Sequence, residues 1–160
     1  MTTVTTGFVN LGGILFDGAN IWVTDAAANA LLKLDASGNI LQTVPAGANP
    51  NFPVFDGQNI WVPNSNDGSI TVVQASNGNI VATILPDATN KLNGPTSASF
   101  DGERILVTNY SGSSVTLFKA ADLSFVANVS MGAGTTPLFA CSDGINFWIA
   151  DQTFKALWRF

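Results

Sequence analysis

The sequence predicts an all-β protein of four repeats, each built from four short strands. The repeat is marked by an Asp-Gly pair between two apolar runs, and it occurs as "LFDGANIWVTD" from Leu15, "VFDGQNIWVPN" from Val54, "SFDGERILVTNY" from Ser99 and "CSDGINFWIAD" from Cys141. The four aspartates, Asp17, Asp56, Asp101 and Asp143, are 39, 45 and 42 residues apart. A period of this length is typical of folds that stack one supersecondary unit on the next.

The first half of each repeat reads as a β-hairpin. Short apolar runs bounded by turn residues predict the first strands over 12–16, 51–55, 96–100 and 138–142. The Asp-Gly pair that follows favours a tight turn, because glycine adopts positive φ without strain. The second strands are then expected over 20–24, 59–63, 104–108 and 146–150.

The second half of each repeat supplies two more strands. Alternating apolar residues predict third strands over 30–35, 69–74, 114–119 and 155–160, and fourth strands over 40–44, 80–85 and 125–130. No fourth strand follows in the last repeat. The first residues, "TTVTTG", read as a detached fourth strand, so we expect an N-terminal strand to complete the last unit.

Four-stranded units repeated every 40–45 residues indicate a β-propeller, and a β-sandwich would not need such regular spacing. The expected blades of this single domain, 1–160, are 8–46, 47–92, 93–132 and 133–160 with 1–7. The strands "IWVTD", "IWVPN" and "ILVTNY", followed by "ASGNILQTV" and "ASNGNIVATI", resemble YVTN-type propeller repeats. They are also similar to virginiamycin B lyase-like and NHL-type blades. The resemblance implies the blade fold and no single activity.

Members of that family usually carry about seven blades in one chain, which leaves the closure of this one open. Two chains could form an eight-bladed ring, four blades could close alone, or the chain could be part of a larger propeller. Only 11% of residues are charged, and such a surface suits packing against copies or partners. We therefore expect a homo-oligomer, with a homodimer as the leading form.

Composition excludes several classes of partner. The net charge is −5 and the six Lys and Arg residues do not cluster, so no nucleic-acid surface is expected. No apolar run is long enough to span a membrane, and the N-terminus has no signal-peptide pattern. The polar, weakly charged composition fits an extracellular or virion-associated setting, although nothing in it fixes the location. The single cysteine, Cys141, is expected to be a buried, inert thiol.

An Asp or Asn stands eight residues after each repeat aspartate, at Asp25, Asn64, Asn109 and Asp151. These residues open the loops between the second and third strands, on the face where loop lengths vary and binding residues usually lie. Their oxygens are candidates for binding a partner, sugar hydroxyls or a cation. The alternative, which we favour, is that each side chain caps its loop by bonding backbone N–H groups.

Aromatic residues supply the other candidates. Trp22, Trp61 and Trp148 share one second-strand position, which is Leu106 in the third repeat, and are expected in the core between blades. Trp158 and Phe160, on the last strand, are expected to pack as well. Phe8, Tyr110 and Phe154 fall in loops and are the aromatic candidates for a partner surface, with Tyr110 and Phe154 as the leading ones.

The residues needed for common catalytic sites are scarce. The chain has no histidine, so no Ser-His-Asp or Cys-His pair can form, and no metal site or cofactor is expected. The leading hypothesis is a non-catalytic binding and assembly module with a protein partner or a second copy of itself. The alternatives are a lectin-like propeller and a metal-dependent propeller hydrolase or lyase.

Overall fold

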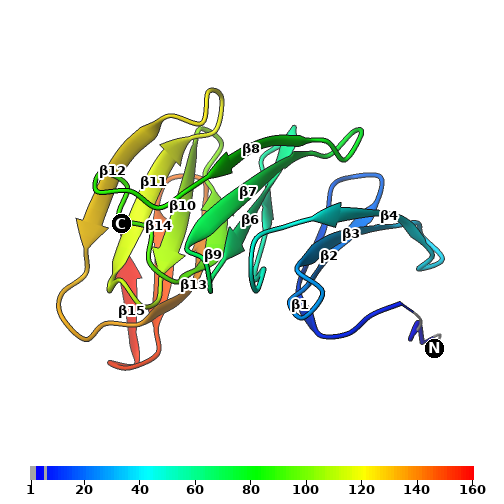
Figure 1. Cartoon of the computed structure of the whole chain (residues 1–160). Coiled ribbons are helices and arrows are strands. Elements are labelled where there is room, and N and C mark those ends of the chain that lie inside the picture. Colours follow the sequence, from blue (N-terminus) through cyan, green and yellow to red (C-terminus); the bar gives the residue numbers. More distant parts are fainter. Residues whose placement is uncertain (1–2, 6) are drawn as a thin grey trace.

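The computed structural model describes residues 3–5 and 7–160, which form four antiparallel sheets arranged as the blades of a β-propeller (Figure 1). Blade 1 holds β1 (Leu11–Phe16), β2 (Ile21–Asp25), β3 (Ala30–Leu34) and β4 (Ile40–Pro45). Blade 2 holds β5 (Val54–Phe55), β6 (Asn59–Asn64), β7 (Ser69–Gln74) and β8 (Ile80–Ile84). Blade 3 holds β9 (Pro95–Phe100), β10 (Arg104–Asn109), β11 (Ser114–Lys119) and β12 (Phe125–Ser130), and blade 4 holds β13 (Pro137–Ser142), β14 (Phe147–Asp151) and β15 (Ala156–Arg159). The predicted fold and strand order are confirmed.

One strand is much shorter than predicted. β5 covers two residues, because Pro53 has no N–H to donate to β6 and Phe52 pairs with blade 3, although Asn51 still donates to the Pro63 carbonyl of β6. The N–H of Phe52 donates to the Thr96 carbonyl of blade 3 at 3.0 Å, and the Phe52 carbonyl accepts from Ala98 at 3.1 Å. This parallel bridge ties the inner strand of blade 2 to that of blade 3.

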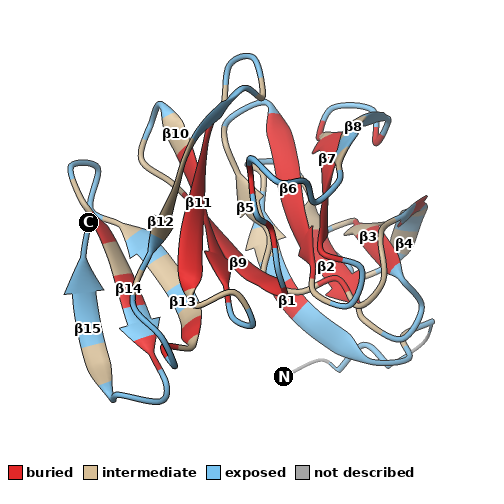
Figure 2. Ribbon diagram, turned by 60° about the vertical axis from the view of Figure 1, so that its left-hand side comes forward, coloured by how far each residue is buried: buried red, intermediate tan, exposed pale blue. Residues whose placement is uncertain are grey.

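The first strands of successive blades lie side by side, with β9 between β5 and β13, and β1 beside β5. The fourth strands, β4, β8 and β12, lie on the outside and have the more exposed residues (Figure 2). This radial order places the loops after the second strands, and the connections between blades, together on one face.

Each sheet has two apolar faces, and inside the chain both are covered. We call the face turned to the following blade the leading face, and the face turned to the preceding blade the trailing face. Three clusters of buried side chains fill the three junctions between blades. In the first, Trp22 and Leu31 of blade 1 pack on Ile60, Val62 and Val73 of blade 2.

The two ends of the arc each leave one face free. The cluster on the trailing face of blade 1 contains only residues of blade 1 and the preceding segment, including Val23, Leu34 and Phe8. Blade 4 lies at the opposite end of the arc in both views (Figures 1 and 2). The four blades therefore form an open arc rather than a ring closed on itself. The expected burial of Cys141 is wrong, because its thiol lies on the uncovered leading face of blade 4.

None of the described residues of the expected N-terminal strand, 3–5 and 7, pairs with the last blade of its own chain. The fourth sheet has three strands, in the order β13-β14-β15. Residues 1, 2 and 6 of the expected strand lie outside the described part of the chain. The described residue Val4 lies beside Gly38, in the β3–β4 turn of blade 1. Val4 thus lies over the trailing face of blade 1, as Val44 of β4 and Val129 of β12 lie over the blades that follow them.

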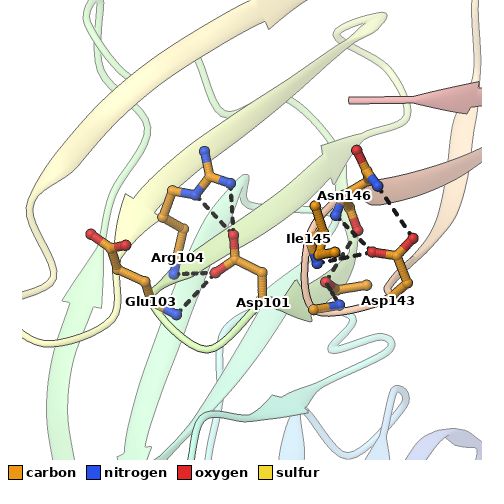
Figure 3. Close-up of polar contacts among 8 residues, drawn as sticks. Asp101, Glu103, Arg104, Asp143, Ile145 and Asn146 are labelled. Carbon is orange, nitrogen blue, oxygen red and sulfur yellow. Dashed lines mark hydrogen bonds and ion pairs between the residues drawn. The ribbon is translucent and has the colours of Figure 1, made fainter.

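Each Asp-Gly turn is held by the aspartate side chain. One carboxylate oxygen accepts the backbone N–H groups two and three residues later, as Asp143 does from Ile145 at 2.9 Å and Asn146 at 2.7 Å (Figure 3). The glycines have φ between +87° and +104°, and a Cβ placed on any of the four would meet nothing within 4 Å. Glycine is therefore required by the backbone conformation and not by lack of space.

The second carboxylate oxygen anchors the tryptophan five residues later. The indole Nε1 donates to Asp17 from Trp22 at 2.7 Å, to Asp56 from Trp61 at 2.7 Å and to Asp143 from Trp148 at 2.8 Å. A buried indole needs such a partner. Trp22 and Trp61 are fully buried, as predicted, whereas Trp148 is only half-buried.

Blade 3 replaces the tryptophan with a different pair of residues. Arg104 donates through Nε to Asp101 at 2.9 Å and forms an ion pair with the same carboxylate at 2.8 Å (Figure 3). Its guanidinium carbon lies 5.6 Å from the centre of the Phe147 ring in blade 4. Leu106 fills the core position that tryptophan holds elsewhere. Arginine here therefore satisfies the turn carboxylate and also contacts the next blade.

The turn carboxylates predict a loss of stability in acid. At Asp101, burial opposes ionisation, but hydrogen bonds from the Arg104 and Glu103 backbone and the Arg104 side chain outweigh it, so its pKa is below the ordinary 3.8. At Asp143, hydrogen bonds from Asn146, Trp148 and Ile145 lower the pKa strongly. Both groups stabilise the folded state above the unfolded pKa, and this stabilisation is lost as pH falls through the folded pKa.

We therefore expect the free energy of unfolding, measured in urea, to fall as pH is lowered from about 5 to about 2. Asp101→Asn should be less stable at pH 7 and should lose less stability over that range, because the titrating group is gone. An unchanged pH dependence in this variant would show that the turn carboxylate does not contribute.

Candidate functional site

The loops that follow β2, β6, β10 and β14 are held by the four repeated Asp and Asn side chains. Asp25 accepts the backbone N–H groups of Val9 at 2.7 Å, Asn10 at 3.0 Å and Ala28 at 3.1 Å. Burial opposes ionisation of Asp25, but these bonds outweigh it and place its pKa below the ordinary value. Asp151 likewise accepts from Thr136, Thr153 and Phe154. Both aspartates therefore join the loop to the connection that enters their blade.

The two asparagines form a different network. Asn109 donates through Nδ2 to Ser114 at 3.2 Å and Thr116 at 2.8 Å, and its Oδ1 accepts from the Asn93 backbone at 3.3 Å. Asn64 donates to Ser69 and Thr71, both at 3.0 Å. In blade 2 the bond to the entering connection comes instead from Asp67, which accepts from the Ala48 backbone at 2.7 Å.

The choice between Asp and Asn follows a sequence pattern that the prediction overlooked. Asparagine is followed five and seven residues later by hydroxyl side chains, Ser69 and Thr71 or Ser114 and Thr116. Aspartate has no hydroxyl at those positions, which are Ala30 and Leu32 after Asp25, and Ala156 and Trp158 after Asp151. An amide can donate to hydroxyl oxygens, whereas a carboxylate can only accept.

The capping role leaves these four side chains out of reach of a partner. Asp25, Asn64 and Asn109 are fully buried, and Asp151 is 3% exposed. They do not form a ring of free oxygens at the loop face. No three carboxylate or thiol side chains within residues 3–5 and 7–160 lie close enough together to hold one metal ion. The accessible candidates are Tyr110 and Phe154, which are 36% and 57% exposed.

Tyr110 lies at the edge of a cavity of about 420 Å³ on the loop face. Loops and strand ends from blades 2, 3 and 4 line it, including Asn51, Ser65, Asn66, Thr96, Tyr110 and Gln152. The Tyr110 hydroxyl donates to Gln152 Oε1 at 3.2 Å, which links the loops of blades 3 and 4 across one wall. Asn51 donates to Ser65 at 2.9 Å on another wall.

The lining offers hydroxyl and amide groups, one aromatic ring and no charged side chain. It can donate and accept hydrogen bonds and provide a stacking surface. Phe154 is exposed on the neighbouring loop but does not line the cavity. Sequence reasoning identified Tyr110 and missed the other lining residues, because Asn51, Asn66 and Gln152 look like ordinary loop residues until the blades bring them together.

Three other aromatic residues singled out in the sequence pack against the blades instead of lining the cavity. Phe8 packs on the trailing face of blade 1, so it is part of the apolar end of the arc and not of the loop face. Trp158 and Phe160 lie at the junction of blades 3 and 4 but remain 40% and 42% exposed, since blade 3 covers them only in part. No helix that could span a membrane occurs in the part of the chain that is described.

The sequence matches no protein-family model and no curated protein. Among solved structures, hydrazine synthase of Kuenenia stuttgartiensis matches with a TM-score of 0.75 at 17% identity, over 92% of this chain and 44% of that chain. Virginiamycin B lyase of Staphylococcus aureus matches with a TM-score of 0.73 at 15% identity, over 94% of this chain and 55% of that one. The WD40 repeats of RRP9 match with a TM-score of 0.73 at 12% identity, over 95% of this chain and 51% of that one.

These similarities confirm the predicted resemblance to lyase-like propellers at the level of the fold. At such identities they carry no information on activity. The chain spans about half the length of the structures that it matches.

The capping network predicts that a buried and an exposed asparagine of the loop face differ in their effect on the free energy of unfolding. Asn109→Ala removes three hydrogen bonds from a buried network and leaves a cavity in place of the amide, so it should lower the free energy of unfolding by about 2–4 kcal/mol. Asn66→Ala, an exposed cavity residue, should change it by less than about 0.5 kcal/mol. Denaturant unfolding of both variants tests this, and equal effects would contradict the structural role of Asn109.

Proposed function

We propose that this chain is a non-catalytic propeller module that assembles with a second copy and uses its loop face to bind a protein. The observation that carries the binding role is the cavity at which the loops of three blades meet, lined by uncharged polar groups and Tyr110.

The energetics of the loop face favour recognition of a partner. Most of the bonds that hold the loops are made by buried side chains, and Tyr110, Asn66 and Gln152 are exposed, so they are accessible to a ligand. A rigid site loses little conformational entropy on binding. Tyrosine is also frequent at protein interfaces, because its ring supplies contact area and its hydroxyl a hydrogen bond.

A lectin-like role is the second candidate, and a specific observation favours it. The cavity combines amide and hydroxyl groups with one aromatic ring and lacks charge, and these are the groups that bind sugar hydroxyls and the apolar face of a sugar ring. Binding on a glycan array that is lost in Tyr110→Ala would replace the protein partner with a carbohydrate.

The protein-binding role predicts the location of selected peptide ligands. Peptides selected from a displayed random library on the wild-type chain should bind Tyr110→Ala about tenfold or more weakly, since the variant loses the one aromatic ring that lines the cavity. Ile145→Ala is the matched control, because Ile145 is 81% exposed in the Asp-Gly turn on the opposite face. Selected peptides that are insensitive to Tyr110→Ala, or equally sensitive to both changes, would contradict a binding site at the cavity.

A further inference from the structure

We propose that two copies of this chain close into one eight-bladed ring, in which the leading face of blade 4 of each copy packs on the trailing face of blade 1 of the other. This is a specific form of the assembly role proposed above and rests on it. It follows from the positions that blade 4 and blade 1 share with the blades inside the chain.

Blade 4 presents side chains that are buried at the other junctions. Strand register makes Trp148 equivalent to Trp22 and Trp61, which are fully buried against the following blade. Leu157, opposite Ala150, is equivalent to Leu31 and Ile70, also fully buried. Leu157 is instead 65% exposed, and Trp148 is half-buried although Asp143 anchors it as in the other blades. The leading face of blade 4 therefore has the side chains that a following blade buries at the other junctions.

A cation on this face has a counterpart in an observed junction. Lys33, opposite Trp22, lies 5.0 Å from the centre of that ring and donates to the Ala75 carbonyl of blade 2 at 3.0 Å. Arg159 has the same place opposite Trp148. The residue of blade 1 equivalent to Ala75 is Ala36, which is exposed. In the ring, Arg159 would donate to the Ala36 carbonyl of the partner.

Blade 1 presents the complementary apolar face. Ile14 is 70% exposed, whereas the equivalent Ala98 is 6% exposed within the junction of blades 2 and 3. Phe16 is 60% exposed, whereas the equivalent Phe55 packs in the junction of blades 1 and 2. A groove of about 560 Å³ runs along this face, lined by Val4, Phe8, Leu11, Ile14 and Leu34 among others. Because this groove is lined mainly by apolar side chains, it can bury the apolar side chains of Trp148 and Leu157 from a partner's blade 4.

The free edge of β15 fits the same arrangement. In blades 1 to 3 the third strand pairs with a fourth, but among the described residues β15 pairs with β14 alone. Val44 of β4 and Val129 of β12 pack over the trailing face of the next blade. Val4 lies over the trailing face of blade 1. A partner's blade 4 seated there would place its β15 edge beside this segment, which could then add as the fourth strand.

A two-fold axis would make the ring close. Each copy would contribute one leading face and one trailing face, so two identical junctions form and no end remains free. The solved propellers that this chain matches are about twice its length, so two copies supply about as much chain as one of them.

The test measures molar mass by light scattering together with the alkylation rate of Cys141. The native chain should have twice the mass of one chain and should react more slowly with a thiol reagent as concentration rises. Cys141 lies opposite Trp148 on the leading face, where the equivalent residues Leu15 and Val54 are partly buried. Leu157→Lys should give single chains and faster alkylation. The Leu157→Lys substitution is present in both junctions of the ring. If it lowers the equilibrium constant for each junction tenfold, the dimerisation constant falls about a hundredfold.

Leu85→Lys is the matched control, since Leu85 is also 65% exposed but follows the outer strand of blade 2. It should remain dimeric. Ile14→Lys should give single chains independently of Leu157. Mixing it with Leu157→Lys should restore dimers, because one of the two junctions then has two native faces.

Single chains at every concentration would overturn the proposal, as would a dimer unaffected by Leu157→Lys in which Cys141 stays reactive. Mass that grows beyond two copies would overturn the closed ring. Each of these outcomes is independent of binding at the loop-face cavity, so failure here is distinguishable from failure of the partner-binding role.

Discussion

The burial of both faces of every blade is the constraint on which the rest of the structure depends. A four-stranded sheet with apolar side chains on each face cannot be stable in water alone, and the chain solves this by stacking blades around a common centre. The three internal junctions are dense clusters with fully buried Trp22, Trp61 and Leu106 at their centres. At the two ends of the arc the same positions meet solvent. The exposed Leu157 and Ile14 are therefore consequences of the repeat and not isolated features.

Polar residues fix the geometry within which those faces meet. Each turn aspartate closes a hairpin with one oxygen and anchors an indole or guanidinium with the other, which sets the side chain that enters the next junction. At the opposite end of the blades, the buried caps such as Asp25 and Asn109 hold the loops to the connections. Because the repeated polar residues are committed to structure, the residues free to recognise a partner are the unrepeated ones, Tyr110 and Gln152 among them.

Much of the fold could be predicted from the sequence, because the same Asp-Gly turn and the same apolar strand pattern occur in each of the four repeats. The third strands 69–74 and 114–119 match the structure, since alternation and turn residues agree there. Two features could not be read from local patterns. Cys141 has the neighbours of a core residue but lies on an end face, and burial there depends on which blade follows. The cavity joins Asn51, Tyr110 and Gln152, whose proximity arises only when three blades meet. The predicted caps are present at Asp25, Asn109 and Asp151, whereas Asn64 bonds only the hydroxyls of Ser69 and Thr71 and its Oδ1 has no hydrogen-bond partner among the described residues. The relation between Asn and the later hydroxyl side chains became visible only from the hydrogen bonds.

Hydrogen–deuterium exchange at increasing protein concentration tests the central constraint most directly, because it reports the protection of each blade separately. If every blade needs a neighbour on both faces, exchange in β14, β15 and β1 should slow as copies associate, while β7 and β10, already covered on both sides, should stay equally protected at all concentrations. Exchange in β14, β15 and β1 that is independent of concentration, or already as slow as in β10 in dilute solution, would contradict the account.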